Sequence, residues 1–505
     1  MILRRRAQPG GRVPRQVLAG AAALGALAAA GQAPLGYWWL ALPALAGVTL
    51  LVASRAAWRP AVLTAWSAGA GYFAAALFWI VEPFMVDAAT DGWMAPFALI
   101  FMAGGMALFW ALAGAAAALG RGRAMRALGF ALGLAATDLL RGYVFTGFPW
   151  ALAGHIWIGT PVMQAAAWVG PVGLSLLTTL VAAAPSLAQG RRGRVAATLV
   201  AAGVLAGLWL GGTARLAAPL AGAATPVHVR LVQPNATQSL KWRADKWDEF
   251  IARQFDLTAE PADRPLDLIV WPETSVPWLL DRSGTLLADI AAAAGGVPVA
   301  VGIQREEGLR YFNSLAFANA RGSLTHVYDK WHLVPFGEYV PFGDRLSAFG
   351  IAAFAAQSGY GYSAGPGPAV VDLGRAGRVL PLICYEAVFP QDLRTDTRPD
   401  WILQVTNDGW FGDLAGPYQH LAQARLRAVE QGLPLLRTAN TGVSAVIDGR
   451  GQVLQSLPLN TAGRIDADVP PALPPTPYSR TGDWPATILL LAGLLGLAVP
   501  LRHRK

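Results

Sequence analysis

Long apolar stretches dominate the first 212 residues of the chain. A helix that crosses a bilayer needs about 20 predominantly apolar residues. Seven stretches approach that length, at 16–31, 36–54, 61–82, 94–119, 126–141, 162–186 and 195–212, and an eighth follows at 484–500. The pattern predicts a polytopic α-helical membrane domain of about eight transmembrane helices, seven of them within residues 1–215 and the last within 484–501.

Residues 225–475 have a different pattern, in which short β-rich runs alternate with helical ones. The strand candidates include 227–233, 266–273, 297–304, 378–386 and 400–408. Between them, residues 243–260 and 418–431 repeat apolar positions at helical spacing. Apolar strands interleaved with helices predict a layered α/β domain with its functional groups at strand ends.

The basic residues mark one side of the predicted membrane domain. They precede the first span and follow the second, fourth and sixth spans, as Arg4, Arg5, Arg6, Arg12, Arg15, Arg55, Arg59, Arg121, Arg123, Arg126, Arg191, Arg192 and Arg194. Because Lys and Arg concentrate in cytoplasmic loops, residues 225–475 are predicted to lie in the periplasm. An alternative is that 16–31 is a cleaved signal peptide. Its removal would place every later loop on the opposite side of the membrane.

The composition agrees with a membrane protein, since 54% of the residues are hydrophobic and 14% are charged. The net charge of +9 does not indicate nucleic acid, because the basic residues punctuate apolar segments. Cys384 is the single cysteine, which excludes an intramolecular disulfide, and no Cys/His cluster indicates a structural metal. We therefore expect neither a metal nor a cofactor.

Three predicted strand ends carry candidate chemistry, with Glu273 in "VWPETS", Lys330 in "VYDKWHLVPFGEYVP" and Cys384 in "LICYEAVF". Taken singly, each has a common structural interpretation: a solvated carboxylate, a surface lysine and an inert core thiol. Taken together, they fit covalent acyl transfer. A carboxylate accepts the thiol proton, and an ammonium group stabilises the oxyanion that forms when the thiolate attacks a carbonyl.

Four motifs in the order "WPET", "DKWHLVPFGEYVP", "CYEAVFP" and "NDGWFGD" resemble the nitrilase, or carbon–nitrogen hydrolase, superfamily. With its flanking spans, the whole chain resembles the bacterial apolipoprotein N-acyltransferases. The resemblance implies an αββα sandwich with a triad in which Glu273 is the general base, Lys330 supports the oxyanion and Cys384 carries the acyl group as a thioester. It also implies supporting roles for Trp242, Glu338, Tyr385 and Glu386. Trp331 departs from the family pattern, in which a basic residue often follows the lysine, so headgroup contacts are not carried over to it.

The same resemblance implies a reaction and its partners. A fatty acyl chain would pass from a phospholipid donor to the N-terminal amine of a diacylglyceryl-modified apolipoprotein, at a periplasmic site of a monomeric protein in the bacterial inner membrane. Membrane lipids would surround it, and no nucleic acid would take part. Two alternatives stay open: a membrane-tethered amidase, and a non-catalytic transporter or binding protein with a nitrilase-like domain. The near absence of ionisable residues in the spans argues against a transport path.

Five further polar residues receive other interpretations. We interpret His332 and His420 as structural histidines rather than as members of a Cys/His dyad. Asp408 and Trp410 fit either a position lining the site or a turn after a strand. Asp138 lies near the outer end of the fifth predicted span, where a carboxylate can reach the interface, and a proton relay is the minor alternative.

The segment 346–368 is apolar, rich in glycine and without clear periodicity. We predict that it is a lid or membrane-dipping loop, on the basis of Phe349, Ile351 and Phe354. An ordinary surface loop is the alternative.

Overall fold

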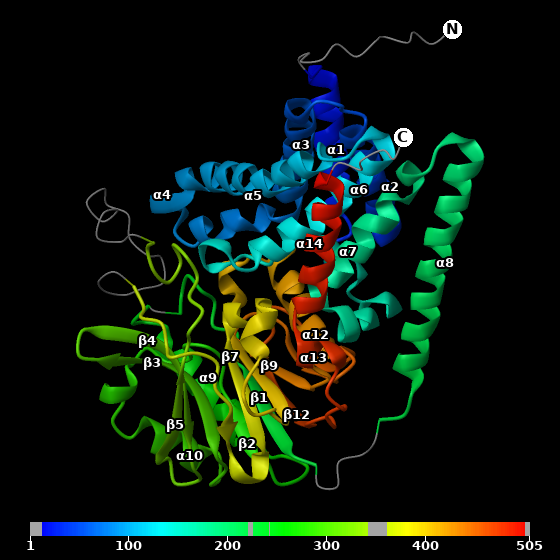
Figure 1. Cartoon of the computed structure of the whole chain (residues 1–505). Coiled ribbons are helices and arrows are strands. Elements are labelled where there is room, and N and C mark those ends of the chain that lie inside the picture. Colours follow the sequence, from blue (N-terminus) through cyan, green and yellow to red (C-terminus); the bar gives the residue numbers. More distant parts are fainter. Residues whose placement is uncertain (1–12, 221–225, 242, 342–360, 500–505) are drawn as a thin grey trace. The chain divides into compact units, whose positions relative to one another are not determined.

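The computed structural model describes residues 13–220, 226–241, 243–341 and 361–499 (Figure 1). The chain divides into two compact units, one made of Met1–Ala218 with Thr476–Lys505 and the other of Pro219–Pro475. Trp242 and the loop residues Phe349, Ile351 and Phe354 lie outside the described residues, so the expectations for them stay predictions.

In the first unit, a helix coincides with each of the eight apolar stretches. These helices are α1 (Arg15–Ala29), α2 (Trp38–Ala53), α3 (Trp58–Ala76), α5 (Ala95–Ala117), α6 (Gly122–Arg141), α7 (Ala166–Leu187), α8 (Gly190–Ala217) and α14 (Trp484–Ala498). Short helices connect them: η1 (Phe78–Met85), α4 (Ala88–Asp91), η2 (Gly92–Met94), η3 (Val144–Thr146), η4 (Ala153–Trp157), η5 (Pro161–Ala165) and α13 (Pro477–Thr481). Apolar helices therefore lie where the hydrophobic pattern predicts them.

The lengths of these helices vary more than the sequence pattern indicates. Within the described part of the chain, 3 continuous helical stretches are long and apolar enough to cross a membrane: Ala88–Ala117, Pro161–Leu187 and Gly190–Ala217. Helix α3 together with η1 makes a fourth if this pair, bent by 47°, counts as one span. Helices α1, α2 and α14 are apolar but shorter. The chain thus has the apolar helices of a membrane protein, and the count of eight spans stays a prediction.

Small residues bring helices α1 and α3 into direct backbone contact. A Cβ atom added to Gly25 of α1 would lie 1.8 Å from the carbonyl oxygen of Ala68, and one added to Gly71 of α3 would lie 2.0 Å from that of Ala22. Such close approach is typical of small residues at helix interfaces in membranes. The first predicted span is therefore packed as part of the helical unit.

A buried ion pair supports the irregular segment between η3 and η4. Asp138 of α6 lies 2.7 Å from Arg141, and it also accepts a hydrogen bond from the backbone N–H of Ala153 at 2.8 Å. Arg141 donates to the carbonyl oxygen of Trp150 at 2.8 Å. Asp138 is only 4% exposed. It is thus buried and paired, and its contacts hold non-helical backbone against α6.

The described residues of the second unit form two six-stranded sheets (Figure 1). The first has the order β12-β1-β2-β3-β4-β5, and the second has the order β11-β10-β9-β8-β7-β6. The strands are β1 (His228–Gln233), β2 (Leu268–Val270), β3 (Val299–Glu307), β4 (Arg310–Ala318), β5 (Leu324–Asp329), β6 (Val371–Asp372), β7 (Arg378–Ile383), β8 (Trp401–Thr406), β9 (Leu435–Ala439), β10 (Ser444–Ile447), β11 (Val453–Leu457) and β12 (Gly463–Asp468). In each sheet three central strands run parallel, β1-β2-β3 in the first and β7-β8-β9 in the second.

Alternation along these strands divides the apolar residues among three layers. Leu268 and Val270 of β2 point into a core that also contains Ile383 and Val405 of the second sheet. Ile269, between them, packs on the opposite face with residues of α10 (Leu286–Ala293). The outer face of the second sheet packs against α12 (Gly416–Gln431). The helices α9 (Trp247–Ala259), α10 and α12 thus cover two sheets that share a core, which confirms the αββα sandwich predicted for this domain.

Candidate functional site

The candidate nucleophile lies at a sharp break after β7. The strand ends at Ile383, and the 3-10 helix η9 (Cys384–Val388) begins at Cys384. The prediction that the strand continues to 386 is therefore wrong at its end. Cys384 has φ 53°, in the left-handed region that non-glycine residues seldom adopt. Strained backbone of this kind is often found at functional sites, where the surrounding structure holds it. At this break the backbone leaves the direction of β7, so Cys384 does not continue the strand.

Glu273 follows β2 in a turn that lies directly against β3. A Cβ atom at Gly302 of β3 would lie 2.1 Å from the carbonyl oxygen of Pro272, so only glycine fits there. The two carboxylate oxygens of Glu273 accept hydrogen bonds from Asn313 Nδ2 at 2.7 Å and from the backbone N–H of Asn407 at 2.7 Å. Glu273 is therefore fixed by β4 of the first sheet and by the residue that directly follows β8 of the second.

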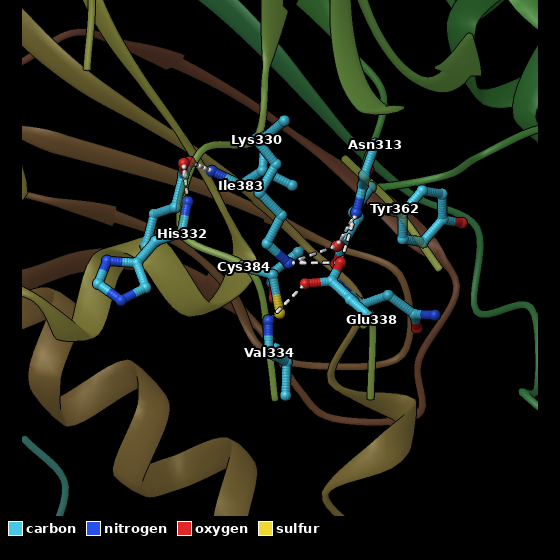
Figure 2. A network of polar contacts seen from close by, with 12 residues as sticks. Asn313, Lys330, His332, Val334, Glu338, Tyr362, Ile383 and Cys384 are labelled. Carbon is cyan, nitrogen blue, oxygen red and sulfur yellow. Dashed lines mark hydrogen bonds and ion pairs between the residues drawn. The ribbon is translucent and has the colours of Figure 1, made fainter. Parts of the chain in front are cut away.

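Lys330 comes directly after β5, and its ammonium group lies between two carboxylates (Figure 2). Its Nζ donates to Glu338 Oε1 at 2.8 Å and lies 3.4 Å from Glu273 Oε1. Glu338 also accepts from the backbone N–H of Val334 at 2.9 Å and from Asn313 Nδ2 at 3.1 Å. Figure 2 shows Cys384 beside the Lys330 side chain, and the two groups interact electrostatically. The structure therefore brings Glu273, Lys330, Glu338 and Cys384 into one buried cluster.

Burial and neighbouring charges set the protonation of this cluster. Burial alone would lower the pKa of Lys330, but the negative Glu338 and Glu273 outweigh it and raise that pKa above its ordinary value. Burial raises the pKa of Cys384, and the charge of Glu273 raises it further, while Lys330 opposes the increase. At neutral pH the resting site therefore holds an ammonium group and a protonated thiol. Attack by sulfur then requires a base at the moment of reaction.

Glu386 joins the turn at Cys384 to the segment after Lys330. Its Oε1 accepts hydrogen bonds from Tyr328 Oη at 2.9 Å and from the backbone N–H of Trp331 at 2.8 Å. Its Oε2 accepts from the backbone N–H of Ile383 at 2.7 Å. Burial raises the pKa of Glu386 to about 7, although the hydrogen bonds of the ionised form oppose this. Glu386 thus positions the two segments that carry the candidate nucleophile and cation.

Tyr385, His332 and Phe389 form an aromatic cluster next to the turn at Cys384. The ring of His332 stacks on Phe389 with centroids 3.4 Å apart, and Tyr385 lies edge-on to Phe389 at 4.9 Å. His332 Nδ1 lies 2.7 Å from Asp392 Oδ2. These contacts fit the structural interpretation of His332, and Tyr385 packs with it next to Cys384.

Asp408 and His420 also lie near Cys384, in fully buried positions. His420 Nδ1 lies 2.9 Å from Asp408 Oδ1, and His420 Nε2 lies 3.0 Å from the carbonyl oxygen of Cys384. Asp408 also pairs with Arg437. His420 therefore contacts the backbone of Cys384, and Asp408 is a buried charged group within the short helix η11 (Asp408–Trp410).

The sequence analysis missed two polar side chains that donate hydrogen bonds to Glu273. Asn313 lies within β4, and its amide donates to both Glu273 and Glu338. Lys241 is 4% exposed and donates from Nζ to the backbone oxygen of Glu273 at 3.4 Å. Burial lowers the pKa of Lys241 to about 8, with Glu273 opposing the decrease. The position of Lys241 in "SLKW", next to the predicted site residue Trp242, was a usable signal, whereas a lone Asn inside a strand was not.

Among the residues that the structure describes, no three His, Cys, Asp or Glu side chains are grouped so that they could hold a metal ion. Cys384 is a free thiol. The candidate chemistry is therefore that of an ionisable thiol with a carboxylate and an ammonium group beside it.

Comparison with protein families agrees with both units. Residues 228–474 match the family described as "Carbon-nitrogen hydrolase", and residues 24–184 match "Apolipoprotein N-acyltransferase N-terminal domain". Fold, site and family matches together define a carbon–nitrogen hydrolase domain joined to a helical membrane domain.

Curated relatives that match most of the chain identify its family within this class. The protein named "Apolipoprotein N-acyltransferase" from Caulobacter vibrioides is 40% identical over 453 residues, which cover 86% of this chain and 85% of the relative. A protein of the same name from Rhodopseudomonas palustris is 38% identical, over 88% of this chain and 86% of the relative. The chain belongs to the apolipoprotein N-acyltransferase family.

Solved structures are similar to the chain over about half its length. An amidase from Nesterenkonia sp. AN1, with the acetamide moiety of fluoroacetamide added covalently at its active-site cysteine, is 18% identical with a TM-score of 0.37, over 50% of this chain and 94% of the amidase. A carbon–nitrogen hydrolase superfamily protein from Xanthomonas campestris is 21% identical with a TM-score of 0.36, over 53% of this chain and 97% of that protein.

Proposed function

We propose that the chain moves a fatty acyl group from a phospholipid to the N-terminal amine of a diacylglyceryl-modified apolipoprotein, through a thioester on Cys384. N-acylation of apolipoproteins is the activity that names the family to which the chain belongs. One observation carries the proposal for the site. The thiol of Cys384, the carboxylate of Glu273 and the ammonium group of Lys330 interact within one buried cluster.

In the first half-reaction, Glu273 acts as the general base and accepts the proton of the Cys384 thiol. The sulfur attacks the ester carbonyl of the phospholipid, and the ammonium group of Lys330 stabilises the resulting oxyanion. When this intermediate collapses, the ester C–O bond breaks and the leaving alcohol of the lysophospholipid takes the proton from Glu273. The product is a thioester on Cys384 with Glu273 again ionised.

In the second half-reaction, the α-amine of the apolipoprotein attacks the thioester carbonyl and gives a proton to Glu273. The C–S bond breaks, the amide is released, and the sulfur regains its proton from Glu273. The cycle is of the ping-pong type. Every group that moves a proton or stabilises charge in it is a side chain of this chain, so the scheme needs no metal or cofactor and operates in a monomer.

We assign supporting roles to the residues around this triad. Glu338 keeps Lys330 charged and in place, since its carboxylate lies 2.8 Å from the ammonium group. Glu386 and Tyr385 hold the turn at Cys384 through the contacts described above. For Trp242, the role near the substrate entrance rests on the family resemblance alone.

We further propose eight membrane spans with the catalytic unit in the periplasm. The support comes from the arginines between α2 and α3, between α5 and α6, and at the start of α8, which mark one cytoplasmic side. The tight packing of α1 against α3 supports retention of α1 as the first span. Reporter fusions after residues 192 and 215 test this orientation, and a cytoplasmic signal from the second fusion would overturn it.

The direct test is intact mass spectrometry of the full chain in detergent with a phospholipid of known acyl composition. We expect a fatty-acyl adduct on Cys384 that disappears when a diacylglyceryl peptide with a free amine is added, with the acyl group recovered on that peptide. Cys384→Ala should carry no adduct. A tethered amidase would instead release free fatty acid at the same rate with or without the amine. Absence of any adduct under conditions of turnover would rule out the thioester.

A further inference from the structure

The register of β7 and β8 places Thr406 next to Cys384. Strands β7 and β8 are parallel, and Ile383 is paired with Val405. Cys384, which comes directly after β7, and Thr406, the last residue of β8, are therefore neighbours at the carboxyl ends of the two strands. Burial raises the pKa of the Cys384 thiol, and the neighbouring side chain of Thr406 opposes that increase. Thr406 is fully buried, so water does not compete for its hydroxyl group.

The same hydroxyl is also held by a fixed carboxylate. Thr406 Oγ1 donates to Asp408 Oδ1 at 2.9 Å. Burial alone would raise the pKa of Asp408, but Arg437 and His420 outweigh it and hold that pKa well below its ordinary value. Asp408 is therefore an ionised acceptor at every physiological pH. With the proton of Thr406 directed at Asp408, the oxygen of Thr406 is free to accept from the S–H group of Cys384.

Asp408 also reaches the backbone of Cys384 by a second route. His420 contacts both Asp408 Oδ1 and the carbonyl oxygen of Cys384, and Gln404 Nε2 donates to that carbonyl at 3.2 Å. These contacts hold Cys384 in its left-handed conformation. The sulfur and the backbone of Cys384 are thus both connected to one buried anion, through Thr406 and through His420.

We propose that Thr406 is a further catalytic residue, whose hydroxyl group turns from Asp408 to the sulfur of Cys384 and donates a hydrogen bond to the thiolate. The proposal rests on the thioester mechanism above. In the resting thiol the S–H group donates to Thr406; when the S–H proton passes to Glu273, the O–H group of Thr406 rotates toward the sulfur. No proton leaves Thr406, and Asp408 keeps its contacts with Arg437 and His420.

The size of the effect follows from the strength of hydrogen bonds to charged groups. Such a bond stabilises by about 1.5–3 kcal/mol, which corresponds to roughly 10- to 100-fold in rate. Three charged groups face the sulfur from other elements: Glu273 after β2, Lys330 after β5 and Asp408 in η11. Lys330 favours the thiolate, and the two carboxylates oppose it. A neutral donor such as Thr406 can therefore stabilise the thiolate further without changing the charge of the site.

The experiment compares Thr406→Val, which has nearly the same shape, with Thr406→Ser, which keeps the hydroxyl group. With full-length enzyme in detergent, we expect T406V to form the acyl-enzyme roughly 10- to 100-fold more slowly than the wild type. The pH midpoint for alkylation of Cys384 by iodoacetamide should rise in T406V. T406S should stay close to the wild type in both measurements. Acylation by T406V within about twofold of the wild type, with an unchanged alkylation midpoint, would overturn the proposal.

A spectroscopic readout separates this proposal from the thioester mechanism. Because Cys384 is the single cysteine, its S–H stretching band in the Raman spectrum is unambiguous. We expect the band at a lower wavenumber in the wild type and T406S than in T406V, whether or not Cys384 is the nucleophile. Should T406V fail to fold, Glu273→Ala decides, since its S–H band should still be lowered by Thr406. A band at the position of a free thiol in that variant would contradict the inference.

Discussion

The amide nitrogen of Asn313 lies 2.7 Å from one carboxylate oxygen of Glu273. The same nitrogen lies 3.1 Å from Glu338 Oε1. Two acidic side chains from different segments, Glu273 and Glu338, thereby share contacts with both Asn313 and Lys330. Asn313 and Lys330 together therefore hold both carboxylates at the candidate site.

Replacing Asn313 with Ala should lower the rate of acyl-enzyme formation by roughly 10- to 100-fold, because two hydrogen bonds to charged groups are lost. Single-turnover acylation followed by intact mass spectrometry measures this rate. Asn319→Ala, in an exposed turn of the same unit, is the matched control and should acylate as the wild type does. Equal rates for the two variants would show that Asn313 has no part in positioning the carboxylates.

Gly302→Ala should displace the turn that carries Glu273. The new Cβ atom would lie 2.1 Å from the oxygen of Pro272, so strand or turn must shift. We expect a loss of about 1–3 kcal/mol in unfolding free energy and a loss of acylation larger than stability alone explains. Thermal unfolding in detergent and the acylation assay measure the two effects. Gly463→Ala, whose Cβ would make an ordinary contact at 3.4 Å, should leave both unchanged.

Glu386 gives the fold a pH dependence whose sign is fixed by its raised pKa. The folded protein binds a proton at Glu386 up to about pH 7, whereas the unfolded chain releases it near the ordinary value of 4.5. The contribution of Glu386 to stability is therefore complete below about pH 4.5 and is lost as the pH rises through 7, by about 3 kcal/mol in all.

The measurement is the difference in melting temperature between the wild type and Glu386→Gln across this range. The glutamine cannot ionise, so the wild type should lose stability relative to the variant as the pH rises from 5 to 8. The amide nitrogen of the glutamine also meets backbone N–H donors, which makes the variant less stable than the wild type at low pH. A difference independent of pH would show that Glu386 does not titrate in the folded protein.

In the membrane unit, Asp138→Leu should destabilise by about 3–5 kcal/mol, because it leaves Arg141 buried without its carboxylate. The double variant Asp138→Leu with Arg141→Met should recover part of this loss. Asp87→Ala removes an exposed carboxylate from the same unit and serves as the control. The readout is the melting temperature of the purified protein in detergent. A double variant no more stable than Asp138→Leu would contradict the role of the pair.

The sequence predicted the parts of the site that follow from strand periodicity and from motifs. Glu273 follows β2 after a two-residue gap, and Lys330 and Cys384 come directly after β5 and β7, so their position at strand ends was foreseeable. The position at which β7 ends was not foreseeable, because "LICYEAVF" is apolar on both sides of the break. A positive φ at a cysteine has no signature in hydrophobic pattern.

Asn313 and Thr406 were missed for a different reason. Asn313 lies inside β4, and Thr406 is the last residue of β8. A polar side chain at such a position ordinarily indicates no function. Their function depends on partners far away in sequence, such as Glu273 for Asn313, 40 positions earlier. Pairing of this kind is set by the order of strands in each sheet, which local pattern does not contain. The same limit applies to helix lengths in the membrane unit, where α3 bends into η1.

The hydrogen bonds of Glu386 to Ile383 and Trp331 have a consequence for how the enzyme adapts to its substrates. They tie the segments bearing Cys384 and Lys330 into a single frame, so neither can be displaced to accommodate a bulky or unusual lipid without straining the other. Variation in what is accepted must then arise outside this frame, in the surfaces that guide lipids toward it. Evolution can retune those surfaces while the reacting centre stays the same.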